Sequence, residues 1–230
     1  ETFYHKGGGG GQTPDYWNNN YQDDIYFRNG EPEETKGYCT DVFFDEAISF
    51  INKNKENSFL CFLSLNAPHS PFNVPKEYYE LYENESDLLE SQKRFYGMIS
   101  NIDDNFGRLH QHVESLGILD NTIIIFTTDN GTSNGYKYSK KDKKWLGFNA
   151  GMRGTKTSEY DGGHRVPFII KWKKGGLFGG HNYSGLSAHV DMLPTLLSFA
   201  KIGFNSTKKI DGTDLSLSLI HISEPTRRAL

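Results

Sequence analysis

The feature that most constrains this 230-residue chain is a long amphipathic segment that runs directly into a short β-branched one. From Phe95 to Leu116, large apolar residues recur at spacings of four and three, as in an α-helix that buries one face. Gly117 follows, a residue type that commonly ends a helix. Residues 122–128 then read TIIIFTT, which is typical of a buried strand. The chain is therefore expected to be α/β, with helices on both faces of a mostly parallel central sheet.

The rest of the chain continues this alternation. We expect helices over residues 40–54 and 190–200, a short acidic helix over 75–82, and strands over 58–65 and 166–172. Residues 1–38 contain a five-glycine run and no clear period, so they are expected to be rich in loops. With 36% hydrophobic and 14% aromatic residues, the chain has enough apolar material for a sizeable core.

Charge and hydropathy exclude two classes of partner. The net charge of −4 offers no broad basic surface for nucleic acid. The lysines between residues 138 and 145 are interpreted as a solvated loop, and contact with an anionic polymer is the alternative. No apolar run approaches the roughly 20 residues needed to span a bilayer. We therefore expect neither a nucleic-acid partner nor a membrane span in this region.

Polar residues follow the β-branched run and point to chemistry. Asp129 and Asn130 end it, and Lys156 follows in the string RGTK. A carboxylate and an amide oxygen suit a hard divalent cation, and a lysine adds a positive charge for an oxyanion. Together they predict a site for a sulfate or phosphate ester. The alternative is structural, because Asp-Asn-Gly more often forms a turn and a lone lysine is more often a surface residue.

A histidine extends this pattern. His69 lies between two prolines in NAPHSP, just after the strand expected over residues 58–65. The prolines would stop that strand and stiffen the loop that carries the imidazole. In open α/β sheets, the binding crevice lies outside the carboxyl ends of the strands. His69 is therefore expected to converge with Asp129 and Asn130.

Five strings identify the chain as similar to a known family. NAPHSP, YGMISNIDDNFGRL, TIIIFTTDNG, RGTKTSEYDGGHRVP and HVDMLPTLL occur in the order found in sulfatases of the alkaline phosphatase superfamily. The resemblance runs from about residue 11 to about residue 214 and implies an incomplete alkaline phosphatase-like fold. It implies a formylglycine nucleophile, a calcium ion, and a sulfated small molecule or sulfated carbohydrate as substrate. It also suggests a secreted, periplasmic or lysosome-like location, although a signal peptide is not assessable.

The resemblance also assigns roles to individual residues. Asp129 and Asn130 match two calcium ligands, and Lys156 matches a lysine that holds the sulfate. His69 matches a histidine that contacts both the sulfate and the leaving-group oxygen. His164, which follows Lys156 closely in the chain, is a further candidate for substrate contact.

Departures from the family pattern predict a partial domain. Residues 1–214 contain no C/S-x-P-x-R string, the source of formylglycine, and neither Cys39 nor Cys61 has the required proline and arginine after it. SEPTR at residues 223–227 has this spacing, but it follows the sulfatase-like region. The paired aspartates that complete the metal site and a GKWHLG-like segment are also missing. Residues 1–214 are therefore expected to be the C-terminal part of a catalytic domain, inactive alone, whose nucleophile lies upstream. Residues 215–230 are expected to be a non-native tail, since LSLIHISEPTR resembles a translated transposon-end adapter.

Two alternatives to a sulfatase remain open. A phosphoester or phosphonate ester hydrolase of the same superfamily would use similar calcium, lysine and histidine groups. A non-catalytic module would keep the anion pocket without turnover. The missing nucleophile string is the feature that would separate these possibilities.

Overall fold

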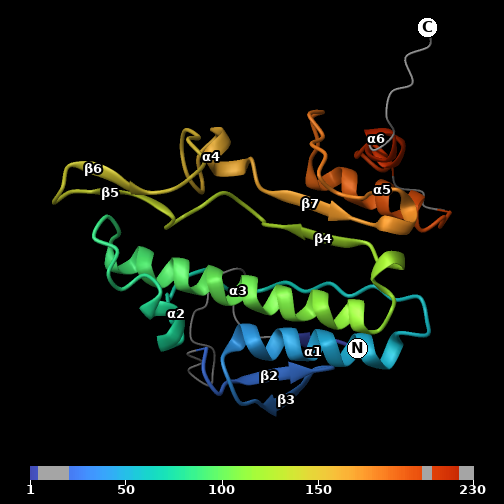
Figure 1. Ribbon diagram of the computed structural model, residues 1–230, viewed down its shortest axis with the longest axis horizontal. Coiled ribbons are helices and arrows are strands. Elements are labelled where there is room, and N and C mark those ends of the chain that lie inside the picture. The colour runs from blue at the N-terminus through green and yellow to red at the C-terminus, as the bar shows by residue number, and fades with distance from the viewer. Residues whose placement is uncertain (5–20, 204–208, 223–230) are drawn as a thin grey trace, which may run out of the picture. The chain divides into compact units, whose positions relative to one another are not determined.

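The computed structural model describes residues 1–4, 21–203 and 209–222, and groups of strands and groups of helices follow one another along the chain (Figure 1). The glycine run at residues 7–11 lies outside this part. Two compact units are formed, one from residues 1–116 and 128–166, the other from residues 117–127 and 167–230. In the described ranges, no helix combines the length and hydropathy needed to cross a bilayer.

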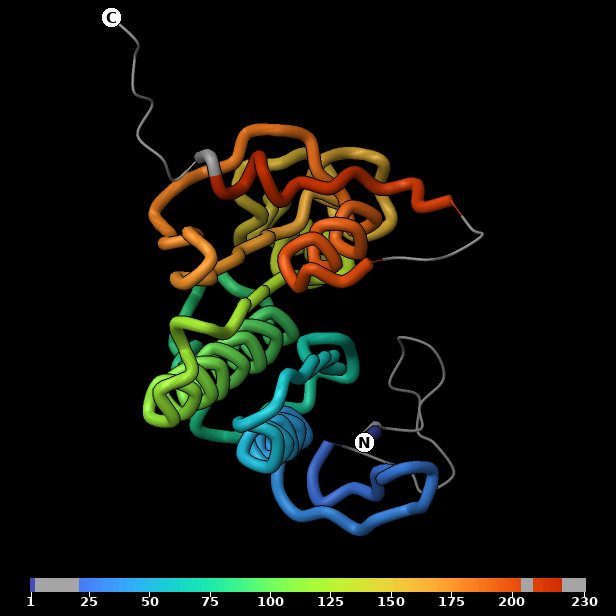
Figure 2. Tube along the Cα trace, turned by 90° about the vertical axis from the view of Figure 1, so that its right-hand side faces the viewer, coloured from blue at the N-terminus to red at the C-terminus, as the bar shows by residue number. Residues whose placement is uncertain are grey.

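Two helices, α1 (Cys39–Asn54) and α3 (Glu90–Ser115), form the centre of the first unit. They lie side by side in Figures 1 and 2. Met98 of α3 is fully buried in the core. Asp41 of α1 accepts hydrogen bonds from the amides of Asn101 (2.9 Å) and Asn105 (2.6 Å), so these two amide nitrogens of α3 have a partner on α1. Both helices were predicted, although α3 begins five residues before Phe95.

A small antiparallel sheet lies against α1. It consists of β1 (Phe3–Tyr4), β2 (Ile25–Arg28) and β3 (Glu31–Glu34). Tyr26 is fully buried, and its ring lies 5.2 Å from that of Phe43. Arg28 donates to both carboxylate oxygens of Glu46 on α1, at 2.7 and 2.8 Å. The loop-rich prediction for residues 1–38 is thus wrong for this sheet, because strands this short carry little period-two signal.

The strand predicted over residues 58–65 is not formed among the described residues. The side chains do alternate between half-buried and exposed from Phe59 to Leu65, as a strand requires. Leu60 and Phe62 are 81% and 87% exposed. However, the backbone makes no ladder with a neighbouring strand in the described ranges, and a strand exists only through hydrogen bonds to a neighbour.

The first unit also contains a hairpin that periodicity did not predict. Strands β5 (Tyr136–Ser139) and β6 (Lys144–Gly147) pair antiparallel. The buried side chain of Gln92 holds the hairpin on α3 by donating to the carbonyl of Leu146 (2.9 Å). Two short helices, α2 (Lys76–Glu80) and α4 (Asp161–His164), complete this unit.

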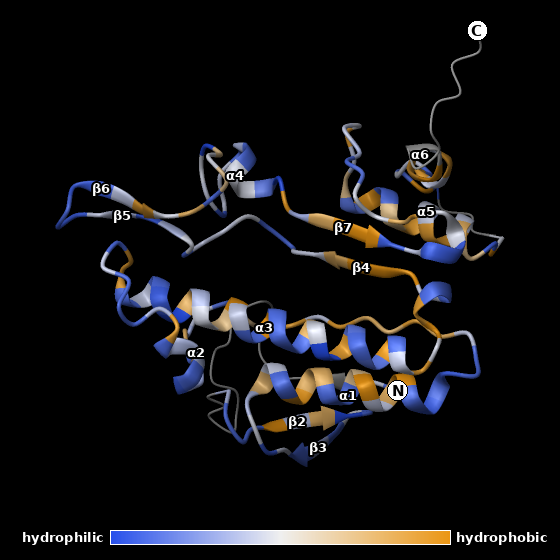
Figure 3. Cartoon of the chain, in the orientation of Figure 1, coloured by the Kyte–Doolittle hydropathy of each residue, from blue (hydrophilic) through white to orange (hydrophobic). Residues whose placement is uncertain are grey.

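The second unit contains β4 (Ile124–Thr127) and β7 (Phe168–Lys171), both of which are hydrophobic in Figure 3. They pair antiparallel, with Ile125 opposite Ile170. Every strand pair in the described part of the chain is antiparallel, so the mostly parallel sheet is not seen there. The remaining elements are the 3-10 helices η1 (Leu119–Asn121), η2 (Lys173–Gly175) and η3 (His189–Asp191), and the helices α5 (Met192–Phe199) and α6 (Ser216–Ile222).

The expected C-terminal tail begins in ordered structure. The backbone N–H of Leu215 donates to the hydroxyl of Thr195 at 2.9 Å, and Ser198 and Ser216 share a hydrogen bond of 3.1 Å. Helix α6 follows and contacts α5. Residues 223–230 lie outside the described part, and the origin of the tail stays a prediction.

Candidate anion and metal site

Asp129 and Asn130 lie in a bend that begins two residues after β4 ends. The Asp129 side chain is exposed and Asn130 is half-buried. Within the described residues, neither side chain has a hydrogen-bond or ion-pair partner. The carboxylate and the amide of this bend are therefore available to a ligand.

Closely packed glycines fix the position of this bend. The N–H of Gly131 donates to the carbonyl of Gly163 at 2.9 Å. A Cβ atom built on Gly131 would lie 1.9 Å from the carbonyl oxygen of Gly162, so no larger residue fits there. A Cβ atom on Gly162 would in turn lie 2.0 Å from the carbonyl oxygen of Gly154. The bend after β4 and the loop over residues 153–163 are thus in direct backbone contact.

Lys156 belongs to the same loop. Its backbone N–H donates to the carbonyl of Thr132 (2.9 Å), two residues beyond Asn130. Lys156 is half-buried, and its ammonium has no ion pair within the described residues. The structure therefore brings the backbone of Lys156 beside the bend that carries Asp129 and Asn130. These contacts make one cluster of backbone, which we call the anion loop, from residues 129–132 and 153–163.

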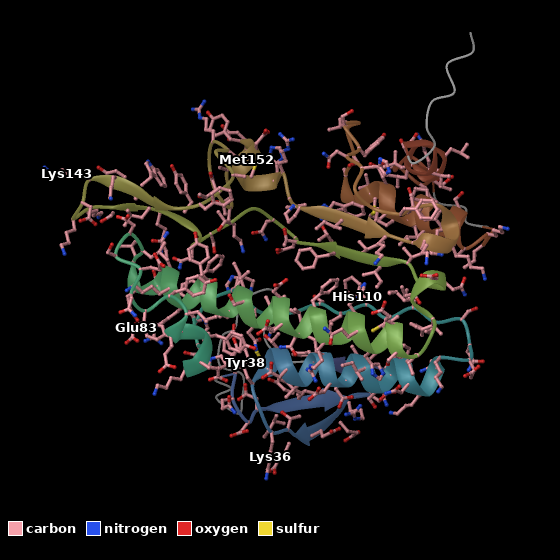
Figure 4. All side chains as sticks on the ribbon, in the orientation of Figure 1. Lys36, Tyr38, Glu83, His110, Lys143 and Met152 are labelled. Atoms are coloured by element: carbon pink, nitrogen blue, oxygen red, sulfur yellow. The ribbon has the colours of Figure 1, made fainter. Side chains whose placement is uncertain are left out.

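Two features of the anion loop were not found from sequence. The side-chain amide of Asn149 donates to the carbonyls of Met152 (2.8 Å) and Gly154 (2.9 Å), so it braces the approach to Lys156; Figure 4 labels Met152. Thr157 has φ +74°, a left-handed conformation that β-branched residues rarely adopt. Nothing in the sequence around Asn149 indicates that its side chain holds two backbone carbonyls. The positive φ of Thr157 likewise has no signature in the sequence.

His69 lies in the loop after the extended segment at residues 58–65. Its Nδ1 donates to the carbonyl of Ser70 (2.9 Å), because a carbonyl can only accept. Nε2 is then the nitrogen left for other partners. The hydroxyl of Tyr21 donates to the carbonyl of His69 at 3.1 Å and holds the loop. No hydrogen bond links His69 to the anion loop within the described residues, so its convergence with Asp129 and Asn130 stays a prediction.

His164 is exposed at the end of α4, and its Nε2 donates to the carbonyl of Glu159 (2.9 Å). Beside it, the guanidinium of Arg153 lies 3.6 Å from the centre of the Tyr160 ring. Both side chains therefore contact residues of the anion loop. A contact between His164 and substrate stays a prediction.

The described residues contain no group of three or more His, Cys, Asp and Glu side chains able to hold a metal. Asp129 and Asn130 offer hard oxygen donors without competing partners. Calcium takes about six to eight oxygen ligands, and these two side chains supply at most three. These two donors fit calcium in chemistry, and by themselves they are too few to complete its coordination.

The chain matches the family model described as Sulfatase over residues 2–202. Among curated proteins, it is 32% identical over 199 residues to the uncharacterized sulfatase YdeN of Escherichia coli, covering 85% of this chain and 33% of that protein. It is 30% identical over 179 residues to N-acetylgalactosamine-6-sulfatase of Sus scrofa, covering 76% and 31%. The chain thus spans about a third of the length of these relatives.

The fold has counterparts among solved structures. The crystal structure of Ps i-CgsB in complex with k-i-k-neocarrahexaose matches with a TM-score of 0.73 and 28% identity, over 86% of this chain and 42% of that one. The α/β class and the alkaline phosphatase-like fold predicted from sequence are confirmed by such neighbours.

Proposed function

Because this chain belongs to the sulfatase family, we propose that its anion loop holds the sulfate group in the active site of a sulfuric ester hydrolase. One observation carries the proposal. Asp129, Asn130 and Lys156 lie on closely packed segments of backbone, and none of their side chains has a polar partner within the described residues. Polar groups that a fold positions and leaves unpaired are suited to a ligand.

Lys156 is proposed to bind a sulfate oxygen. Its ammonium is a compact positive charge with three donors, and it sits on a loop whose backbone is fixed at Thr132 and Gly163. Negative charge grows on the sulfate oxygens as the ester bond breaks. A lysine held in place stabilises that charge without reorganising.

Asp129 and Asn130 are proposed to hold a calcium ion through their side-chain oxygens. When bound, calcium polarises the sulfate oxygens as a Lewis acid. Two side chains supply at most three oxygens, so further ligands are needed, and the paired aspartates of the family pattern, which this chain lacks, would supply them. The glycine contacts at residue 131 would keep both donors in position.

His69 is proposed to stabilise or protonate the leaving-group oxygen. Its Nδ1 is occupied by the carbonyl of Ser70, so the opposite nitrogen would carry the proton to the departing alkoxide. His164 is proposed to contact substrate at the edge of the anion loop through its remaining ring nitrogen, Nδ1.

The nucleophile is proposed to be a formylglycine in sequence outside these 230 residues. Residues 1–214 contain no C/S-x-P-x-R string, and the relatives are longer than this chain; both observations support the proposal. Ser223 in SEPTR has the spacing but belongs to the expected non-native tail. The chain by itself should then give no turnover of an aryl sulfate, since the other groups do not replace a nucleophile.

The substrate is proposed to be a sulfated carbohydrate or another small sulfate ester. Two similar proteins have names that refer to sugars, N-acetylgalactosamine-6-sulfatase and the neocarrahexaose complex. A phosphoester or phosphonate ester hydrolase is the second candidate, because lysine and calcium also bind those anions.

The proposal is tested on the chain extended with its upstream reading frame. We expect turnover of 4-nitrophenyl sulfate, and Lys156→Ala should lower kcat/KM by roughly 100-fold or more. Lys174→Ala, at an exposed lysine in the second unit, should leave kcat/KM unchanged. Faster turnover of 4-nitrophenyl phosphate than of the sulfate would favour the phosphoesterase. Binding of sulfate without any turnover would identify a non-catalytic module.

A further inference from the structure

The hairpin formed by β5 and β6 presents a cluster of exposed aromatic rings. Tyr138 is 49% and Trp145 54% exposed. Trp145 stacks on Tyr136 with ring centroids 4.8 Å apart and an interplanar angle of 14°, and Tyr138 meets the same indole edge-on at 5.8 Å. Apolar rings gathered on a surface commonly mark a binding face. None of these residues belongs to the anion loop.

The hairpin is firmly held. The amide of buried Gln92 donates to the carbonyl of Leu146, and the hydroxyl of Tyr96 donates to the carbonyl of Gly135 at 2.6 Å. In the turn, the hydroxyl of Ser139 donates to Asp142 (2.6 Å) and accepts from the N–H of the same aspartate (3.1 Å). A surface fixed in this way loses little entropy when a ligand binds.

Lysines surround the rings. The hairpin and its turn contain five lysines and a single acidic residue, Asp142, in a chain whose net charge is −4. Lys144 pairs with Asp87 at 3.0 Å. The side chains of the other four make no hydrogen bond or ion pair within the described residues: Lys137, Lys140, Lys141 and Lys143. Figure 4 shows Lys143 at the turn, with its side chain directed away from the rest of the first unit.

We propose that this hairpin binds a sulfated carbohydrate chain. Sugar rings have apolar C–H faces that would lie on the Tyr136, Tyr138 and Trp145 cluster, and sulfate groups would pair with the free ammonium groups of the turn. The assignment rests on the proposed function, because a sulfated polymer would then bind the same protein at two places. The hairpin holds the polymer and the anion loop receives one sulfate ester.

A nucleic acid is the other polyanion that lysines attract. The carbohydrate is favoured because the rings are packed against one another. Tyr136 covers one face of Trp145 and Tyr138 lies at the edge of the indole, which leaves a compact platform rather than separate rings for successive bases. The proposed function, hydrolysis of a sulfate ester, also favours a polymer that carries sulfate groups over one that carries phosphate groups.

Binding by the 230-residue chain tests this proposal directly. Dextran sulfate is immobilised, with uncharged dextran as the matched surface. Lys140→Gln, Lys141→Gln and Lys143→Gln together should raise the Kd for dextran sulfate by roughly tenfold or more and flatten its dependence on salt. The matched control replaces Lys36, Lys55 and Lys174 by glutamine, three exposed lysines outside the hairpin, and should change the Kd less than about twofold. Lys36 is labelled in Figure 4.

The aromatic platform has a separate test. Trp145→Ala should raise the Kd roughly threefold to tenfold, whereas Phe178→Ala, at an exposed phenylalanine of the second unit, should not. Tyr138→Ala keeps the stack of Trp145 on Tyr136, so a raised Kd in this variant excludes loss of the hairpin as the cause. Thermal midpoints accompany every variant.

Three results would overturn the proposal. They are unchanged binding of the triple hairpin variant, equal binding to uncharged dextran, and binding of single-stranded DNA as tight as that of dextran sulfate. Failure here is distinguishable from failure of the proposed function. The Lys156 experiment uses a small aryl sulfate that does not need the hairpin, and the binding experiment needs no turnover.

Discussion

At the scale of residues, the segment around Lys156 is held in a costly conformation. Thr157 has a positive φ, which costs about 1–3 kcal/mol in a residue other than glycine. The backbone bond from Lys156 to Thr132 and the two bonds donated by Asn149 hold the segment in place. Strain maintained by several independent contacts is typical of ligand clamps, and here it lies next to the proposed sulfate lysine.

Asp191 gives a pH-dependent prediction. Its carboxylate accepts from the N–H groups of Thr213 and Ala188, both at 2.7 Å, and these bonds lower the pKa of Asp191. Because the folded pKa lies below the unfolded value of about 3.9, the stabilisation is complete only above about pH 5 and is lost as pH falls through the unfolded and then the folded pKa. Asp191→Asn should therefore lower the thermal midpoint at pH 7, and the gap from the unsubstituted chain should narrow toward pH 3. A gap independent of pH would contradict this role.

The residues of the site could be predicted only in part. Asp129, Asn130 and Lys156 occur in strings whose chemistry is visible without a structure. The brace from Asn149 and the backbone angle of Thr157 depend on where distant segments pack, so no local pattern carries them. The hydrogen bond from Thr213 to Asp191 could not be predicted for the same reason, because the two residues lie 22 positions apart in the sequence.

At the scale of elements, helices were easier to predict than strand pairs. The apolar period of α3 and the left-handed Gly117 (φ +71°) after it are local properties, so the helix and its end were predicted. The hairpin β5–β6 was missed because it depends on a turn closed by Ser139 and Asp142 and on the distant Gln92. The pairing of β4 with β7 joins residues more than 40 positions apart, and sequence pattern does not give its direction.

The glycine contact in the anion loop makes a prediction at this scale. Gly131→Ala places a Cβ atom against the carbonyl of Gly162, so either the bend or α4 must move. We expect the free energy of unfolding to fall by about 2 kcal/mol or more in urea titrations. Gly107→Ala, in α3 with no atom near the new Cβ, is the matched control and should raise it by about 0.5–1 kcal/mol. Equal effects of the two substitutions would mean that the anion loop is not closely packed.

At the scale of the whole molecule, the chain matches about a third of each of its curated relatives, and the two proposed calcium ligands are too few for a complete site. Asp129 and Asn130 lie ready for a cation, and the described residues place no further carboxylate cluster beside them. We therefore propose that ligands beyond the described residues, such as the paired aspartates of the family pattern, complete the calcium site. It follows that calcium should bind this chain weakly and an extended chain well.

The central claim is that Asp129 is a metal ligand and not simply a turn residue. The thermal midpoint, measured with calcium and with chelator, tests it in three proteins: this chain, the chain extended upstream, and the extended chain carrying Asp129→Ala. At free calcium 100 times the dissociation constant, a native-state ligand adds about 2.7 kcal/mol of stability. We predict a calcium-dependent rise in the midpoint of the extended chain alone. An equal rise in the extended Asp129→Ala protein would contradict the account.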